Sequence, residues 1–162
     1  MSTKLNPIFS RLALGLSLVG VFTNAHATDE PFNVSMTLLA PLTITELTAL
    51  SFVDTNAGSA TTVVTAPSDA LAASFSATGT PLDSATGSVV EASITMTTGG
   101  GGATEQIVVD TFTTGGDMDA AGATTFDAAG NIADLRVGGT ANIDATDVAG
   151  IYSGTATFRL IY

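Results

Sequence analysis

The residues with the greatest capacity for chemistry are aspartates in glycine-rich stretches. Asp117 and Asp119 lie two residues apart in the stretch GGDMDAAG, and Asp144 and Asp147 flank a further turn. Calcium takes about six to eight oxygen ligands from carboxylates and carbonyls, so Asp117 and Asp119 are weak candidate calcium ligands. The EF-hand pattern with its closing glutamate is absent, and Asp and Gly also dominate ordinary β-turns. We therefore expect turns, and no metal site, at these positions.

The side chains that catalysis commonly requires are scarce. An acidic chain offers many carboxylate pairs of the kind that glycosidases use, but this one has no Trp, and Tyr152 and Tyr162 are its only tyrosines. The glycine run Gly99 to Gly102 lacks the Lys and Ser/Thr that complete a phosphate-binding loop, so it predicts a hairpin tip. We expect no enzymatic activity, no catalytic residue and no cofactor.

The first 27 residues have the three parts of a secretory signal peptide. Lys4 and Arg11 give a positive start, Leu12 to Phe22 is almost entirely apolar, and Ala25 and Ala27 are the small residues that a signal peptidase reads. The apolar run is about half of the ~20 residues that a membrane-spanning helix needs. We expect cleavage after Ala27, export to the periplasm, cell surface or medium, and no membrane span in the mature protein.

Cleavage would leave a strongly acidic protein. The full chain carries a formal charge of −11 with four basic residues. Cleavage of the signal peptide would remove Lys4, Arg11 and the only histidine, His26. Arg136 and Arg159 would then be the only basic side chains left. Such a chain cannot neutralise a phosphate backbone, which excludes nucleic acid as a partner, and it has no Cys–His or Ser–His pair for nucleophilic catalysis.

Apolar residues of the remaining chain alternate with polar ones, which predicts β-strands. Short strands are expected over Phe32 to Leu38, around Leu50 to Val53, over Thr61 to Thr65, around Ala73 to Ala77, over Ser88 to Thr97, over Ile107 to Phe112, around Leu135 to Ile143 and over Gly150 to Tyr162. The Gly138–Gly139 pair suggests a bulge, and Phe126 is the expected anchor of the long connection between Gly115 and Gly130.

These strands predict one all-β domain over residues 28–162. No segment keeps a helical apolar period, and eight or nine short strands with polar turns are typical of an antiparallel, immunoglobulin-like β-sandwich. A closed barrel is the alternative. In the closing strand we expect Tyr152, Phe158, Leu160 and Tyr162, after Gly150, to share one face.

The two ends of this region carry motifs of a known family. Pro41 to Thr45, Leu50 and Phe52 stand near its start, and the stretch AGIYSGT with a final Tyr162 stands at its end. These motifs resemble the bacterial domain-of-unknown-function 4402 family, although that family usually has Gly where Val53 follows Phe52. The resemblance implies an exported immunoglobulin-like β-sandwich and no catalytic residue.

A weaker similarity links the closing strand to chaperone–usher pilins of the spore-coat-U-like type. Those also end in an alternating strand closed by Tyr, with a Gly twelve residues earlier, as Gly150 and Tyr162 are placed here. Two features depart from the pilin pattern, because Tyr162 is the last residue and only Thr28 to Pro31 precede the first expected strand.

The role of the first strand stays open between two alternatives. Phe32, Val34, Met36 and Leu38 could fill a groove in their own domain or in a neighbouring subunit, and we favour the self-complete domain. The function that fits best is an exported structural protein, such as a fimbria-like or matrix subunit, whose partners are its own copies or other surface proteins. The alternative is a monomeric secreted or periplasmic binding module, with calcium as one conceivable ligand.

Overall fold

The computed structural model describes residues 28–162. The expected signal peptide and its cleavage residues Ala25 and Ala27 lie outside the described residues. Residues Thr37–Tyr162 form one compact unit, whereas the described residues before Thr37 belong to a separate unit. Within the described part of the chain, no helix is long and apolar enough to cross a membrane.

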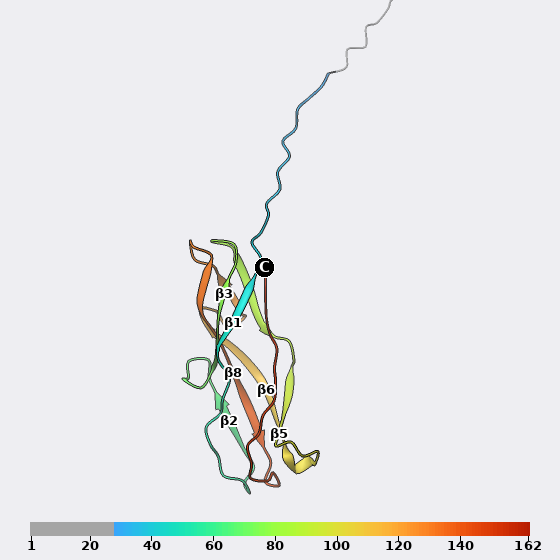
Figure 1. The fold of residues 1–162 in the computed structure, drawn as a ribbon, viewed down its shortest axis with the longest axis vertical. Helices are drawn as coiled ribbons and strands as arrows, with labels where there is room; N and C mark the ends of the chain where they lie inside the picture. The colour runs from blue at the N-terminus through green and yellow to red at the C-terminus, as the bar shows by residue number, and fades with distance from the viewer. Residues whose placement is uncertain (1–27) are drawn as a thin grey trace, which may run out of the picture. The chain divides into compact units, whose positions relative to one another are not determined.

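The larger sheet has six strands in antiparallel pairs (Figure 1). Its main path runs β1 (Thr43–Thr48), β3 (Ala73–Thr78), β8 (Asn131–Ile143), β6 (Gln106–Gly116) and β5 (Ser93–Thr97). Strand β2 (Thr61–Thr65) pairs with the later half of β8, from Gly139 to Ile143. The long strand β8 therefore organises this sheet, because β2, β3 and β6 all pair with it.

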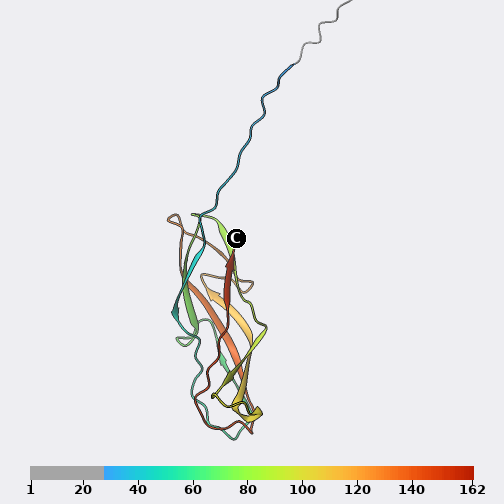
Figure 2. The same ribbon diagram turned by 45° about the vertical axis from the view of Figure 1, so that its right-hand side comes forward.

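The smaller sheet has three strands in the order β7 (Ala123–Thr125), β4 (Ser84–Val89) and β9 (Phe158–Ile161). Both of its pairs are antiparallel. Strand β9 is the dark red arrow that leads to the C-terminus in Figure 2. The only helix in the described residues is a single 3-10 turn, Ala103–Glu105, between β5 and β6. The predicted all-β, antiparallel sandwich is confirmed, and two separate sheets replace the alternative of a closed barrel.

The core is built mainly from the inward-facing apolar residues of the strands. Strand β8 buries Ile132, Leu135 and Val137, each at most 4% exposed, and its register against β3 shifts between Ile132 and Leu135. They join Phe126 and Leu160 in a cluster that links the two sheets. A second cluster around Val63, Ile107 and Val109 lies mainly within the larger sheet, and several of its neighbours are only half-buried. The predicted role of Phe126 is confirmed, because its ring is 1% exposed.

The expected strand Ser88 to Thr97 is wrong as one element. Strand β4 ends at Val89 and belongs to the smaller sheet, while β5 begins at Ser93 and belongs to the larger one. Val90 is 43% exposed where the chain passes between them. The apolar alternation continues through this crossing although Val90 and Ala92 are exposed there, so periodicity alone hides the break.

The first two expected strands are also corrected. No strand forms over Phe32 to Leu38, and the first strand runs from Thr43 to Thr48 instead of around Leu50 to Val53. A strand exists only where its backbone N–H and C=O groups meet those of a partner. An alternating segment without a partner therefore has the sequence of a strand and no ladder.

The sequence suggests a bulge at Gly138–Gly139. The bulge lies instead on β6, the strand that pairs with this part of β8. The register of β6 against β8 shifts between Asp110 and Thr113, and Thr111 there has a φ of 50°. A side chain at Gly139 would lie 3.2 Å from the Phe112 ring. Gly139 thus leaves room for Phe112, which packs against both core clusters.

Candidate functional site

The two candidate calcium ligands are engaged by the backbone of their own turns. One carboxylate oxygen of Asp119 accepts hydrogen bonds from the N–H groups of Ala121 and Ala123, each at 2.8 Å. The Asp117 carboxylate accepts one from Asp134 N–H at 2.9 Å. These are contacts of turn-forming aspartates, and they orient the two carboxylates toward backbone donors.

The other acidic loops follow the same pattern. The Asp127 carboxylate accepts from Ala129 N–H at 2.8 Å and Asn131 N–H at 2.7 Å, and the latter bond is the main cause of its lowered pKa. Asp147 is buried and accepts from Asp144 N–H at 2.8 Å. Within residues 28–162, no three His, Cys, Asp or Glu side chains lie close enough together to hold a metal ion.

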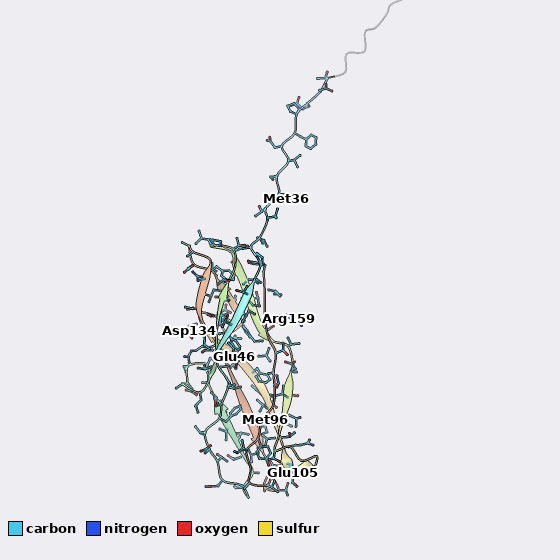
Figure 3. The ribbon with its side chains drawn as sticks, in the orientation of Figure 1. Met36, Glu46, Met96, Glu105, Asp134 and Arg159 are labelled. Carbon is cyan, nitrogen blue, oxygen red and sulfur yellow. The ribbon has the colours of Figure 1, made fainter. Side chains whose placement is uncertain are left out.

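The glycine run forms the predicted hairpin tip between β5 and β6. Gly99 has a positive φ of 96°, and the Glu105 carboxylate accepts a hydrogen bond from Gly102 N–H at 3.1 Å. Glu105 is labelled at this end of the sandwich in Figure 3. The loop is thus closed by a carboxylate, which would repel a phosphate.

The segment from Phe32 to Leu38 presents a row of exposed apolar side chains. Phe32, Val34, Met36 and Leu38 are between 78% and 83% exposed. Polar residues Asn33, Ser35 and Thr37 separate them, and no residue from Pro31 to Ala40 is charged. The structure assigns no strand to this segment, and whether it fills its own domain or a neighbouring subunit stays a prediction.

A groove runs along the compact unit, and its narrower, mainly apolar part lies between the two sheets. We call it the inter-sheet groove. Residues 46–57 form one flank and residues 147–158 the other. Its narrower part has a volume of about 300 Å³, and its wider part has about 460 Å³. Glu46 on the first flank and Met96 on the floor are labelled in Figure 3.

The floor of the inter-sheet groove consists of side chains that a complete sandwich would cover. Phe75, Ile94, Met96 and Phe112 line the narrower part, and each is only half-buried. Phe158 closes this part by stacking on Phe75, with ring centroids 4.6 Å apart. The larger sheet therefore extends beyond the cover that the three-stranded smaller sheet provides.

Both flanks of the groove carry backbone groups without a partner in the described structure. Leu50 and Phe52 form no backbone hydrogen bonds there, although Ser51 between them donates to Leu71 C=O at 2.8 Å. On the other flank, Gly154, Thr155 and Ala156 likewise form none within residues 28–162. An edge of this kind can accept an added strand.

The closing strand of the sequence is shorter in the structure. Strand β9 begins at Phe158, while Ser153 forms an isolated bridge to Thr97 and residues 154–157 form no strand. Leu160 is buried and Phe158 half-buried, as expected of one inward face. Tyr152 lines the wider part of the groove and donates to Val148 C=O at 2.7 Å, and burial is the main cause of its raised pKa.

Tyr162 anchors the chain just before β1. Its hydroxyl accepts a hydrogen bond from Thr80 N–H and donates one to Ala40 C=O, each at 2.7 Å. The Thr80 hydroxyl in turn accepts from Ala40 N–H at 2.6 Å. The last residue thus fixes Ala40 on the compact unit. The closing tyrosine is visible in the sequence. Its hydrogen-bond partner Ala40 is 122 residues away, so only the folded structure reveals this contact.

Glu91 holds the flank of the groove in place, a role that the sequence did not reveal. Its carboxylate accepts hydrogen bonds from the backbone N–H and the hydroxyl of Thr157, each at 2.8 Å. The backbone bond is the main cause of the lowered pKa of Glu91, with the hydroxyl next. The crossing between β4 and β5 brings Glu91 to this position.

Replacing Glu91 with Gln should flatten the acid dependence of stability. A lowered pKa means that the folded state holds the proton less tightly than the unfolded state, so the contact stabilises above the ordinary value of 4.5 and this stabilisation is lost as pH falls through the lowered pKa. Urea unfolding between pH 7 and pH 3 would measure the slope. Glu30→Gln, outside the compact unit, is the matched control, and equal slopes for both variants would contradict the role of Glu91.

Comparison with known proteins places the chain in a family. A family model described as "Domain of unknown function (DUF4402)" matches residues 33–162. No curated protein and no solved structure gives a significant match. The matched region includes the exposed segment from Asn33 onward, both flanks of the inter-sheet groove and the closing Tyr162. The chain belongs to the DUF4402 family.

Proposed function

We propose that this protein is an exported, non-enzymatic structural subunit that self-associates at the cell surface or outside the cell, as in a fimbria-like fibre or a matrix. The observation that carries the proposal is the row formed by Phe32, Val34, Met36 and Leu38, which are 78–83% exposed. Contiguous exposed apolar side chains mark a surface that another molecule covers.

The absence of charge in this row supports self-association through it. The chain has a formal charge of −11, so its copies repel one another over most of their surface. The uncharged stretch from Pro31 to Ala40 escapes this repulsion. The acidic loops use their carboxylates to stabilise turns, which supports a structural rather than a catalytic role.

The proposal predicts export and assembly of the natural chain. Protein recovered from cells that express the full 162-residue chain should begin at Thr28 and should sediment as multimers or appear as fibres by electron microscopy. A chain that keeps Met1 would overturn the export part. A protein that stays monomeric at all accessible concentrations would overturn the structural role and favour a secreted binding module.

A further inference from the structure

The exposed segment is long enough to line the narrower part of the inter-sheet groove. Extended backbone rises about 3.3 Å per residue, so residues 32–39 would span about 26 Å. In the narrower part the flanks are residues 46–52 and 154–158, and in the wider part they continue over residues 50–57 and 147–152. One extended segment of this length would therefore line the whole of the narrower part.

The two surfaces also match in chemistry. The segment offers an apolar side chain at every second residue from Phe32 to Leu38, and the groove floor offers half-buried Phe75, Met96 and Phe112. Glu46 is the one charged residue that lines the narrower part. An uncharged occupant suits that site, and residues 31–40 carry no charge.

The backbone of the groove would receive such a segment as a strand. Residues 154–156 form no backbone hydrogen bonds within residues 28–162, and they lead into β9, which pairs on one side with β4. A segment beside them would extend the three-stranded sheet to four strands and cover the open part of the larger sheet. Its polar residues Asn33, Ser35 and Thr37 would then face solvent, as period-two alternation requires.

We propose that residues 32–39 of one copy fill the inter-sheet groove of a second copy as an added strand. This inference rests on the proposed function and specifies its contact. Each copy has one segment to give and one groove to fill, so the contact is heterologous, and it propagates from copy to copy wherever the rotation between copies does not close a ring. The fibre-like assembly of the proposed function corresponds to the open form, a linear chain with an empty groove at one end and a free segment at the other.

The absence of cysteine allows a direct test by disulfide trapping. One preparation of the full chain would carry Met36→Cys in the segment, and a second, enlarged by a tag, would carry Ala156→Cys on the groove flank. Disulfides form only where the two Cβ atoms come within about 4.5 Å. Mixing the two preparations and oxidising them should give a heterodimer of distinct size, and such a product is necessarily intermolecular.

Two controls fix the site and the orientation of the strand. Ala133→Cys, at an exposed alanine of β8 that does not line the groove, should give about tenfold less heterodimer, because binding does not raise the local concentration of its thiol. Ser35→Cys and Thr37→Cys should couple to Ala156→Cys less than Val34→Cys and Met36→Cys do. Equal yields at all positions would overturn the inference.

The cross-linking results distinguish failure of this inference from failure of the proposed function. Multimers without the Met36–Ala156 heterodimer would overturn strand exchange and leave the structural role standing. A chain carrying both Met36→Cys and Ala156→Cys that becomes cross-linked only within itself would show that the segment fills its own groove, which also overturns the inference. A monomer with no cross-link of either kind would overturn both proposals.

Discussion

Replacing Phe126 with Ala should lower the free energy of unfolding by about 3–5 kcal/mol, which is a large part of the ~5–15 kcal/mol that a domain possesses. Phe126 is 1% exposed and follows β7 in the smaller sheet, and its ring centroid lies 6.0 Å from that of Tyr162. The ring also occupies the space above Gly79, where an added Cβ would lie 2.7 Å from its Cζ. Its removal leaves a cavity between elements that are far apart in sequence.

The matched control is Phe32→Ala, which removes the same atoms from a side chain that is 83% exposed. Surface substitutions usually change stability by less than about 0.5 kcal/mol. Urea unfolding followed by far-ultraviolet circular dichroism, at a concentration where the protein is monomeric, would measure both variants. A loss below about 1 kcal/mol for Phe126→Ala would contradict its place in the core. A large loss for Phe32→Ala would indicate that the first segment completes its own domain.

The strands that the sequence predicted well are those whose alternating residues face one core. Strands β2, β3 and β8 fall close to the expected ranges because their inward residues, such as Val63, Ala77 and Leu135, are buried. Phe126 was also predictable, since it is the only aromatic residue in a long polar connection. In each case local pattern and burial agree, which is the usual condition for a correct prediction.

The groove and its flanks could not be predicted from the sequence. Leu50 and Phe52 alternate as strand residues do, but they border an opening where no partner strand lies in the described structure. Glu91 continued the polar side of an apparent single strand, and its bond to Thr157 exists only because the chain changes sheets at that point. Periodicity reports which face of a segment is apolar, and it does not report which molecule covers that face.

Deleting residues 28–38 should leave the compact unit folded with nearly unchanged stability and should abolish assembly. The deleted side chains Phe32, Val34, Met36 and Leu38 are at least 78% exposed, so they contribute little to the folding of their own chain. A strand that completed its own domain would instead account for about 1.5–3 kcal/mol for each of these four side chains. Urea unfolding and sedimentation of the deletion variant would separate the two cases.

A synthetic peptide of residues 28–39 should then stabilise the deletion variant, because the peptide binds the folded groove and not the unfolded chain. At a peptide concentration of about 100 times Kd, mass action adds about 2.7 kcal/mol to the free energy of unfolding, and the melting temperature should rise by several degrees. A peptide in which serine replaces Phe32, Val34, Met36 and Leu38 should produce no rise. A peptide in which alanine replaces Asn33, Ser35 and Thr37 should act like the natural one, since those residues face solvent in the added strand. If both altered peptides stabilise the variant equally, binding does not follow the alternation and the groove is not the site. If the natural peptide has no effect while the deletion still abolishes assembly, the segment joins copies through some other surface, because a groove that accepts this strand must be stabilised by it.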